Sequence, residues 1–356
     1  MTAPRPHGPR PRPRRPSAGR TSGARAAGAA TVGFAGAAVL LAVLLPALAQ
    51  PAADATAEAR PAAAAADPAA CTGEGAAATG GGRTCTRYGP AARLGRGTVR
   101  TYTEYAGGVP KALGVSLGAE ALTALPSAPT DGRHCHDADG DGSTDTRHEC
   151  VGGHSLELAL PATPRDAPGL PYQWALFNWN PHGHSPHGRY DVAHFDVHFY
   201  LVPREVRAAI RTGRCALLID CGQLAEAAEP VPAAFLPAGY PASSPQTAEG
   251  AMGAHLDSRP PTSGTLSGQT FIYGAYGGEI VFMEPMLTKD FLLRHRTSAG
   301  HRTCEPVPQP AAWRIPGWYP TRYCTAYRPA ERDYTVSLTD FAPSAGLRGH
   351  AAADAP

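Results

Sequence analysis

Apolar and polar residues alternate in short runs along the chain from residue 98 onwards, and Gly and Pro separate these runs. The run 194–202 shows the pattern most clearly, because His, Asp, His and Tyr fall on one face while Phe, Val and Phe fall on the other. Alternation of this kind is typical of half-buried strands. The expected strands are 98–105, 155–160, 172–179, 194–202, 270–273, 279–283, 318–327 and 334–338.

Helical patterns are few. We expect one short helix over 116–125, with Ser116 as its N-cap and Pro126 as its stop, and another over 203–210. The sequence Ala-Tyr-Gly-Gly at 275–278 lies between two expected strands and predicts a hairpin. Together these features predict a mainly β fold, a β-sandwich or a barrel-like domain with a few short helices.

The N-terminal segment has the pattern of an export signal. An apolar run over 31–48 follows a basic segment, since residues 1–25 contain seven Arg and no Asp or Glu. The run ends in Ala-Leu-Ala at 47–49, which predicts a signal peptide over 1–49 and a mature chain from Gln50. An uncleaved anchor is the alternative, because the run approaches the ~20 apolar residues that span a bilayer. Either way, we expect a secreted or extracytoplasmic protein.

The rest of the chain divides by composition. Residues 50–70 are mostly Ala, Pro, Asp and Glu, which predicts a disordered linker. Residues 71–97 are rich in Gly, and we expect a loosely held arm stapled by a disulfide. A single β-rich domain is expected over 98–342, followed by a disordered tail over 343–356.

Charge limits the choice of partners. Without the leader the chain carries 25 Lys and Arg against 30 Asp and Glu, and only Lys111 and Lys289 are lysines. Nucleic-acid binding needs clustered positive charge, so we expect no nucleic-acid partner. Contact with a membrane is expected only through residues 1–49, if they stay uncleaved. The sequence leaves the oligomeric state open, a homo-oligomer included.

All eight cysteines follow the leader, and an even number in an exported chain predicts disulfides. They fall into four close pairs in sequence order, and pairing between neighbours is the simplest arrangement. No CxxC motif occurs, which argues against a zinc ribbon or a thioredoxin-like redox site. The expected pairs are Cys71–Cys85, Cys135–Cys150, Cys215–Cys221 and Cys304–Cys324.

An acidic loop at 137–145 matches the start of a calcium-binding loop, with carboxylates at alternate positions and Gly at the sixth. It departs from the EF-hand at the twelfth position, where His148 replaces the bidentate Glu and Glu149 follows one residue late. Cys135 and Cys150 bracket the loop and could clamp it in place of helices. A solvated acidic loop is the alternative. The candidate Ca²⁺ ligands are Asp137, Asp139, Asp141, the Ser143 carbonyl and Asp145.

Histidines gather in one segment, since five of the thirteen that follow the leader lie within 182–198. On a straight strand, residues two apart lie ~6.6 Å apart and could share an ion, whereas residues four apart lie ~13 Å apart and could not. Asp196 is therefore expected to join only one of its neighbouring strand histidines, and a histidine of the preceding loop would complete the set. Histidines that only form hydrogen bonds are the alternative. The candidate metal ligands here are His182, His184, His194, Asp196 and His198.

Two residues further along the chain are candidates for the remaining positions. Glu284 falls on one face with Ile280 and Phe282, and a carboxylate on an apolar face is costly unless it is paired or bound to a metal. The alternative is that Pro285 ends the strand and Glu284 turns to water. His255 is the second candidate. Imidazole and carboxylate ligands suit zinc, copper, iron or nickel, and we expect Zn²⁺.

Five segments carry a resemblance to a known family. They are 113–126, 179–184, 194–200, 252–255 and 271–286. In these segments the chain resembles an uncharacterised family of exported bacterial domains, one member of which is an envelope-stress (sigma-E) controlled protein of a thermophile. The resemblance covers most of 99–341 and leaves out the Gly-rich arm. The family carries no assigned activity, so the resemblance supports the domain and leaves its function open.

Three functional hypotheses follow. The first is an exported domain of unknown activity with a His/Asp/Glu metal site and a calcium-like loop. The second is a metal-dependent enzyme, a hydrolase, lyase or oxygenase, which would need an open coordination position in a pocket. The third is a structural or envelope-stress protein without a catalytic role. A pocket that opens onto the histidines would favour the enzyme, and a closed site would favour the structural protein.

Overall fold

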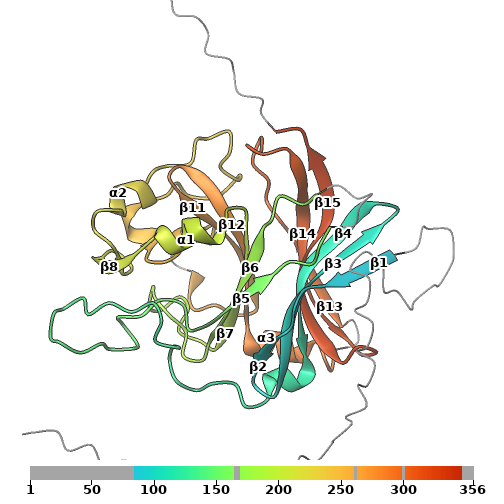
Figure 1. The fold of residues 1–356 in the computed structure, drawn as a ribbon, viewed down its shortest axis with the longest axis horizontal. Helices are drawn as coiled ribbons and strands as arrows, with labels where there is room; N and C mark the ends of the chain where they lie inside the picture. The colour runs from blue at the N-terminus through green and yellow to red at the C-terminus, as the bar shows by residue number, and fades with distance from the viewer. Residues whose placement is uncertain (1–83, 164–168, 260–262, 299–300, 347–356) are drawn as a thin grey trace, which may run out of the picture. The chain divides into compact units, whose positions relative to one another are not determined.

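The computed structural model describes residues 84–163, 169–259, 263–298 and 301–346 (Figure 1). The predicted signal peptide over 1–49 and linker over 50–70 lie outside these residues, as does most of the predicted tail over 343–356. The described strands form two antiparallel sheets, so the prediction of a mainly β fold with a few short helices is confirmed.

The first sheet, sheet A, combines strands from both ends of the described chain. Its central hairpin is formed by the two longest strands, as the alternation over 318–338 predicted. The strands are β1 (Thr84–Tyr88), β2 (Ala92–Leu94), β3 (Gly97–Ala106), β4 (Val109–Gly118), β13 (Arg302–Pro306), β14 (Gly317–Arg328) and β15 (Asp333–Ser344). They are ordered β1-β3-β4-β15-β14-β13, and β2 pairs with β3 beside this path.

The second sheet, sheet B, is built from the middle of the chain. Its strands are β5 (His154–Ala159), β6 (Trp174–Asn180), β7 (His194–Tyr200), β9 (Ala248–Glu249), β10 (Gly253–Asp257), β11 (Gln269–Tyr276) and β12 (Glu279–Thr288). They are ordered β5-β6-β7-β12-β11-β10-β9. The histidine-bearing strand β7 is therefore central, with β6 on one side and β12 on the other.

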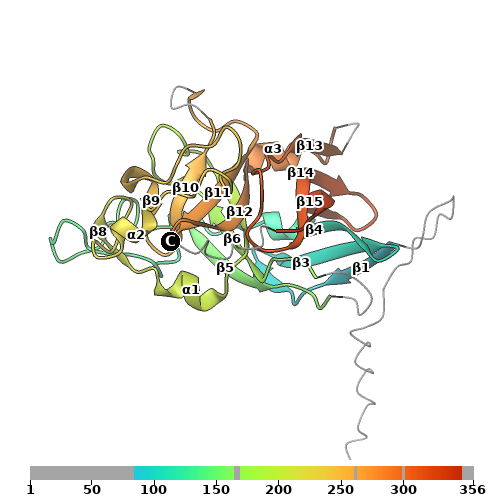
Figure 2. The same ribbon diagram turned by 90° about the horizontal axis from the view of Figure 1, so that it is seen from above.

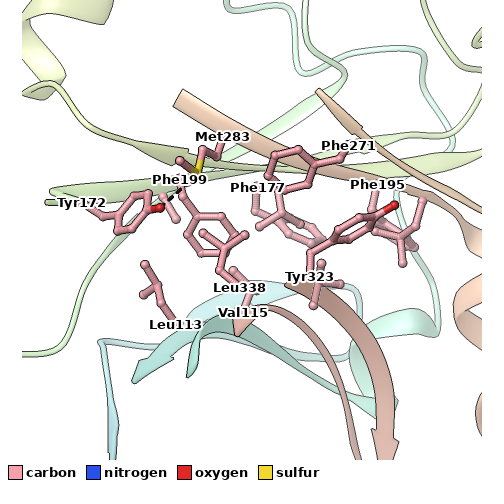
Figure 3. Close-up of a cluster of buried hydrophobic side chains, with 14 of the residues drawn as sticks. Leu113, Val115, Tyr172, Phe177, Phe195, Phe199, Phe271, Met283, Tyr323 and Leu338 are labelled. Carbon is pink, nitrogen blue, oxygen red and sulfur yellow. Dashed lines mark hydrogen bonds between the residues drawn. The ribbon is translucent and has the colours of Figure 1, made fainter. Parts of the chain in front are cut away.

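The inner faces of the two sheets pack against each other through one large apolar cluster (Figure 3). Leu113 and Val115 of β4 and Leu338 of β15 face Phe177 of β6 and Phe199 of β7. Each of these side chains is at most 1% exposed, and burying one contributes roughly 1.5–3 kcal/mol. The arrangement is a β-sandwich, and its core uses the apolar face of each alternating strand.

The outer face of sheet B is covered as well. Figures 1 and 2 show the segment with α1 (Arg204–Ala209), β8 (Thr212–Cys215) and α2 (Leu224–Ala227) on the side of sheet B away from sheet A. Every residue of β6 and β7 is buried, whereas a strand with one wet face would alternate. The polar side chains of β7 are therefore enclosed by protein. The remaining short elements are η1 (Ala119–Leu122), η2 (Pro245–Thr247) and α3 (Lys289–Arg294).

Two expectations about local structure are wrong. The helix predicted over 116–125 is absent, because β4 runs on to Gly118 and only η1 follows. Ser116 pairs with Thr335 in the ladder and donates a hydrogen bond to Asp333, so strand pairing overrides its signal as a helix cap. Part of the arm predicted to be loosely held, residues 84–94, instead forms β1 and β2, which pair with β3.

Other local signals are confirmed. The strand predicted over 194–202 is β7, and the helix predicted over 203–210 is α1, which begins directly after Pro203. The hairpin predicted at 275–278 joins β11 to β12 through Gly277 and Gly278. Each of these depends on a signal contained within about ten residues of sequence.

Three of the four predicted disulfides are confirmed: Cys135–Cys150, Cys215–Cys221 and Cys304–Cys324. The fourth, Cys71–Cys85, involves Cys71, which lies outside the described residues. Three disulfides indicate folding in an oxidising, extracytoplasmic environment. None of the helices in the described ranges has both the length and the apolar character needed to cross a bilayer.

Candidate metal centre

Strand β7 directs three chemically active side chains to the outer face of sheet B. His194, Asp196 and His198 alternate with core residues, and they are 0%, 3% and 1% exposed. Burial of three such groups side by side is expensive unless each finds a partner. His194 and Asp196 lie close to His184, whereas His198 lies close to His255 and Glu284. The outer face therefore carries two groups of candidate ligands.

The first group consists of His184, His194 and Asp196, whose ligand atoms all lie within 4.8 Å of one another. The Nε2 atoms of His184 and His194 lie 3.4 and 3.2 Å from the two carboxylate oxygens of Asp196. His184 comes from the loop between β6 and β7. Gly183 permits this placement, because its φ is +74° and a Cβ there would meet the Tyr190 carbonyl at 1.9 Å.

The ring orientations of the first group are fixed by the backbone. Nδ1 of His194 lies 2.7 Å from the Val192 carbonyl, and Nδ1 of His184 lies 2.6 Å from the Ser185 carbonyl. A carbonyl only accepts, so both Nδ1 atoms are the protonated donors, and the Nε2 lone pairs of neutral rings point towards Asp196. Two acceptors that face each other repel unless a proton or a cation lies between them.

The charges of the first group depend on one another. Burial opposes a charge on His184, but contact with the Asp196 carboxylate outweighs it and raises the pKa of His184 to about 9. Burial also opposes ionisation of Asp196, yet the neighbouring His194 and His184 hold its pKa well below the ordinary value. The surroundings of Asp196 therefore favour a positive charge next to its carboxylate, carried by His184 or by a bound cation.

Asn180 of β6 completes the surroundings of the first group, and its role was missed in the sequence. Its amide nitrogen lies 2.6 Å from Asp196 Oδ2 and 3.2 Å from His194 Nε2. Its Oδ1 atom is buried and has no hydrogen-bond partner among the described residues. The pairing of β6 with β7 would have identified Asn180, because it lies directly opposite His194 in this ladder.

The second group consists of His198, His255 and Glu284, and its ligand atoms also lie within 4.8 Å of one another. The Nε2 atoms of His198 and His255 lie 3.5 and 3.8 Å from the two oxygens of Glu284. The alternative that Glu284 turns to water is wrong, since β12 continues through Pro285 and Glu284 is 1% exposed. Glu284 shares the outer face with Phe282, as predicted, whereas Ile280 packs against the inner core.

The ring of Phe282 packs against both histidines of the second group, which also contact each other with ring centroids 6.3 Å apart. Phe282 packs edge-on against His198, with ring centroids 4.8 Å apart, and against His255 at 5.3 Å. The ring lies over Gly274 of β11, where a Cβ would meet it at 2.1 Å. Gly274 therefore leaves the space that the Phe282 ring occupies between the strands β10 and β12.

The second group is held in its uncharged form. Burial lowers the pKa of His198 to about 3 and also lowers the pKa of His255, which the Glu249 carboxylate partly opposes. Burial, followed by the charges of Asp196 and Glu249, raises the pKa of Glu284 well above its ordinary value. Neutral imidazoles are the form in which histidine binds a metal ion.

A cavity of about 620 Å³ opens onto both groups. His184 of the first group and His255 of the second line it, and Glu249 lies beside His255 with an oxygen 3.6 Å from Nδ1. Arg189 and Arg259 also line the cavity, and both donate to Asp257. Apolar parts of the lining come from Pro186, Tyr190, Leu217, Tyr240, Ile272 and Met286.

His182, the remaining metal candidate, is not brought to either group. Its Nε2 atom lies 2.9 Å from the Ser127 carbonyl at an exposed position. Its neighbour His184, two residues on, is the loop histidine that reaches Asp196. The sequence offered both and contained no local signal to separate them.

The acidic loop brings together a different set of carboxylates from the one predicted. Asp137, Asp139 and Glu149 offer oxygens within 4.8 Å of one another, while the carboxylates of Asp141 and Asp145 are outside this set. Glu149 is buried and accepts hydrogen bonds from the backbone N–H groups of Ala138 at 2.7 Å and Asp145 at 2.8 Å. Glu149 therefore holds the two ends of the loop together through hydrogen bonds to its backbone.

Comparison of the chain with protein-family models, with curated proteins and with solved structures found no match.

Proposed function

We propose that the protein is an exported metal-binding domain, with Zn²⁺ bound by His184, His194 and Asp196. The observation that carries the proposal is the orientation of the two rings, whose Nδ1 atoms donate to backbone carbonyls while their Nε2 atoms face one carboxylate. A histidine that binds a metal through one ring nitrogen usually donates its other N–H to a carboxylate, a backbone carbonyl or a water molecule.

The distances within this group fit an ion better than hydrogen bonds. Charge-assisted N–H···O bonds measure about 2.7–2.9 Å, whereas the two Nε2–oxygen distances are 3.4 and 3.2 Å. Donors that bind one zinc ion at ~2.0–2.2 Å in a tetrahedron lie roughly 3.3–3.6 Å apart. Rotation of the Asn180 amide would exchange its nitrogen for Oδ1, which would then supply a fourth donor.

Zinc is our choice among the ions that this donor set suits, which are zinc, copper, iron and nickel. All cysteines in the described ranges are disulfide-bonded, so imidazole and carboxylate are the donors that remain. The export signal over 1–49 and the resemblance to an exported bacterial family belong to the same proposal. They would place the site in a compartment where the three disulfides persist.

The test is the metal content of untagged protein secreted into medium that contains physiological trace metals. We expect zinc in the purified protein and its loss at this group in Asp196→Asn and His184→Gln. The matched control is His187→Gln, which alters an exposed histidine of the same loop that lies 2.8 Å from Asp191. Protein that binds no transition metal after dialysis against micromolar Zn²⁺ would exclude the proposal.

A metal-dependent enzyme is the second candidate function, and the cavity of about 620 Å³ favours it. If Asn180 keeps its present orientation, three protein ligands leave a zinc ion with an open position, and His184 lines the cavity, so a substrate could approach the ion. The volume lies within the range of small-molecule sites. A screen with ester, phosphoester and lactam substrates, run with wild-type protein and Asp196→Asn, tests this candidate.

The acidic loop is a second candidate ion site, for Ca²⁺ at Asp137, Asp139 and Glu149. Carboxylate oxygens suit this hard cation, and the Cys135–Cys150 disulfide closes the base of the loop. We expect a weak site, with a dissociation constant on the order of 10⁻⁴–10⁻³ M, as in extracellular modules. Calorimetry with wild-type protein and Asp139→Asn checks this, and no heat at millimolar Ca²⁺ would exclude it.

A further inference from the structure

The six ligand side chains on the outer face of sheet B form two complete and separate sets. Each set has two imidazoles and one carboxylate within 4.8 Å of one another. The sets are His184, His194 and Asp196, and His198, His255 and Glu284. Two histidines and one carboxylate are sufficient protein ligands for a divalent transition metal that keeps further positions open.

One ion cannot serve both sets. His194 and His198 are four residues apart on β7, which corresponds to ~13 Å along a strand. Asp196 and His198 are neighbours on the same face at ~6.6 Å. The β7–β12 pairing also sets the groups side by side, because Met286 is the residue paired with Asp196 and Glu284 lies two positions before it.

The second set has unmet bonding capacity that the fold does not explain. Glu284 Oε2 and both ring nitrogens of His198 are buried without a hydrogen-bond partner among the described residues. Glu284 is only 1% exposed. Leaving a buried carboxyl oxygen without a hydrogen-bond partner costs about 1–3 kcal/mol, so such an atom in a native fold indicates a ligand.

We propose that His198, His255 and Glu284 bind a second divalent transition-metal ion beside the first. The proposal rests on the proposed function, since it adds an ion to the centre described above. His184 and His255 both line the cavity of about 620 Å³, so one molecule in the cavity could contact both ions. The domain would then carry a two-ion centre beside the cavity of about 620 Å³.

Metal stoichiometry tests the proposal. The full chain, expressed with its leader and stripped of metal with a chelator, is titrated with Zn²⁺ in millimolar Ca²⁺, which occupies the acidic loop. We expect two Zn²⁺ ions per wild-type chain, one in Glu284→Gln, one in Asp196→Asn and none in the double variant. His255→Gln, on the short strand β10, is the second variant for the new site, and His187→Gln is the control with two ions. Circular dichroism confirms that each variant is folded.

The outcomes separate the two proposals. One ion per wild-type chain that is lost in Asp196→Asn and kept in Glu284→Gln would overturn the second site and leave the proposed function standing. Two ions that persist in both Glu284→Gln and His255→Gln would also overturn it, because the second ion would lie elsewhere. No ion in wild-type protein would overturn both. A drop from two to one in Glu284→Gln and His255→Gln supports the two-ion centre.

Discussion

Both sheets bury a carboxylate on their outer face, and the two carboxylates have different surroundings. On sheet A, Asp333 accepts two hydrogen bonds from Arg328, at 2.8 and 2.6 Å, and a third from Ser116 at 2.5 Å. On sheet B, the Nε2 atoms of His198 and His255 lie 3.5 and 3.8 Å from the oxygens of Glu284, beyond the length of a strong hydrogen bond. The side chains of Asp333 and Glu284 are 7% and 1% exposed, so burial does not account for the difference.

This difference gives a criterion that separates structural from functional carboxylates in this fold. A buried carboxylate that serves the fold is satisfied by short hydrogen bonds, because any unmet bond lowers stability. A buried carboxylate surrounded by imidazoles at the spacing of ion ligands lowers the stability of the ion-free protein and serves binding instead. Sheet A therefore has the pattern of a structural ion pair, and sheet B has the pattern of a binding site.

The largest change in the free energy of unfolding is expected for a substitution on sheet A. Asp333→Ala should lower the free energy of unfolding by about 3 kcal/mol, because it leaves the partly buried Arg328 without its main partner. Metal content should not change. Urea unfolding measures the first quantity and elemental analysis the second. An unfolding free energy within 1 kcal/mol of wild type would show that the Arg328–Asp333 pair contributes little and would remove the contrast between the sheets.

The next effect is on sheet B, from removal of the ion. Wild-type protein with free Zn²⁺ at 100 times the dissociation constant of a site should lose about 2.7 kcal/mol for each ion that a chelator removes. In a domain of this size, each kcal/mol corresponds to about 2–4 °C in the unfolding temperature. Differential scanning calorimetry with and without chelator checks this. Asp196→Asn should lose only the contribution of the first group, and a shift equal to that of wild type would place the stabilising ion outside the first group.

Much of the fold was predictable because its signals are local. Alternation identified β7, paired turn residues identified the hairpin at 277–278, and close spacing in sequence identified three disulfides. The failures at Ser116 and at β1 have a common cause. Strand pairing with distant residues decided their conformation, and such pairing leaves little trace in a short window of sequence.

The ligand types of the site were predictable, but their grouping was not. Alternation placed His194, Asp196 and His198 on one face, and the strand rise ruled out one ion for both histidines. The partner of His198 depends on the register between β7 and β12, which brings Glu284 from almost ninety residues downstream. Asn180 and Glu149 were missed because only pairing or loop closure places them near the ligands.

A smaller change in the free energy of unfolding is expected at Glu284, with the opposite sign from the change at Asp333. Glu284→Met should leave the ion-free protein equally stable or stabilise it by about 1 kcal/mol, because an apolar side chain of similar length replaces a carboxylate with an unmet bond. Zinc content should fall at the same time. Urea unfolding in chelator measures stability. A loss of more than about 2 kcal/mol would mean that Glu284 is a structural group like Asp333.

The smallest effect is expected at His182, which lies two residues before His184 in the same loop. His182 is exposed and is bound to the Ser127 carbonyl, whereas Nε2 of His184 faces Asp196. His182→Ala should therefore change the free energy of unfolding by no more than about 0.5 kcal/mol, as is usual for surface substitutions. Zinc affinity should stay within twofold of wild type, while His184→Ala should lose the ion of the first group. Competition with a fluorescent zinc chelator measures both affinities. If His182→Ala weakens zinc binding as much as His184→Ala does, the loop must rearrange when the ion binds, and the ligand set would include the histidine that the ion-free fold directs away from the site.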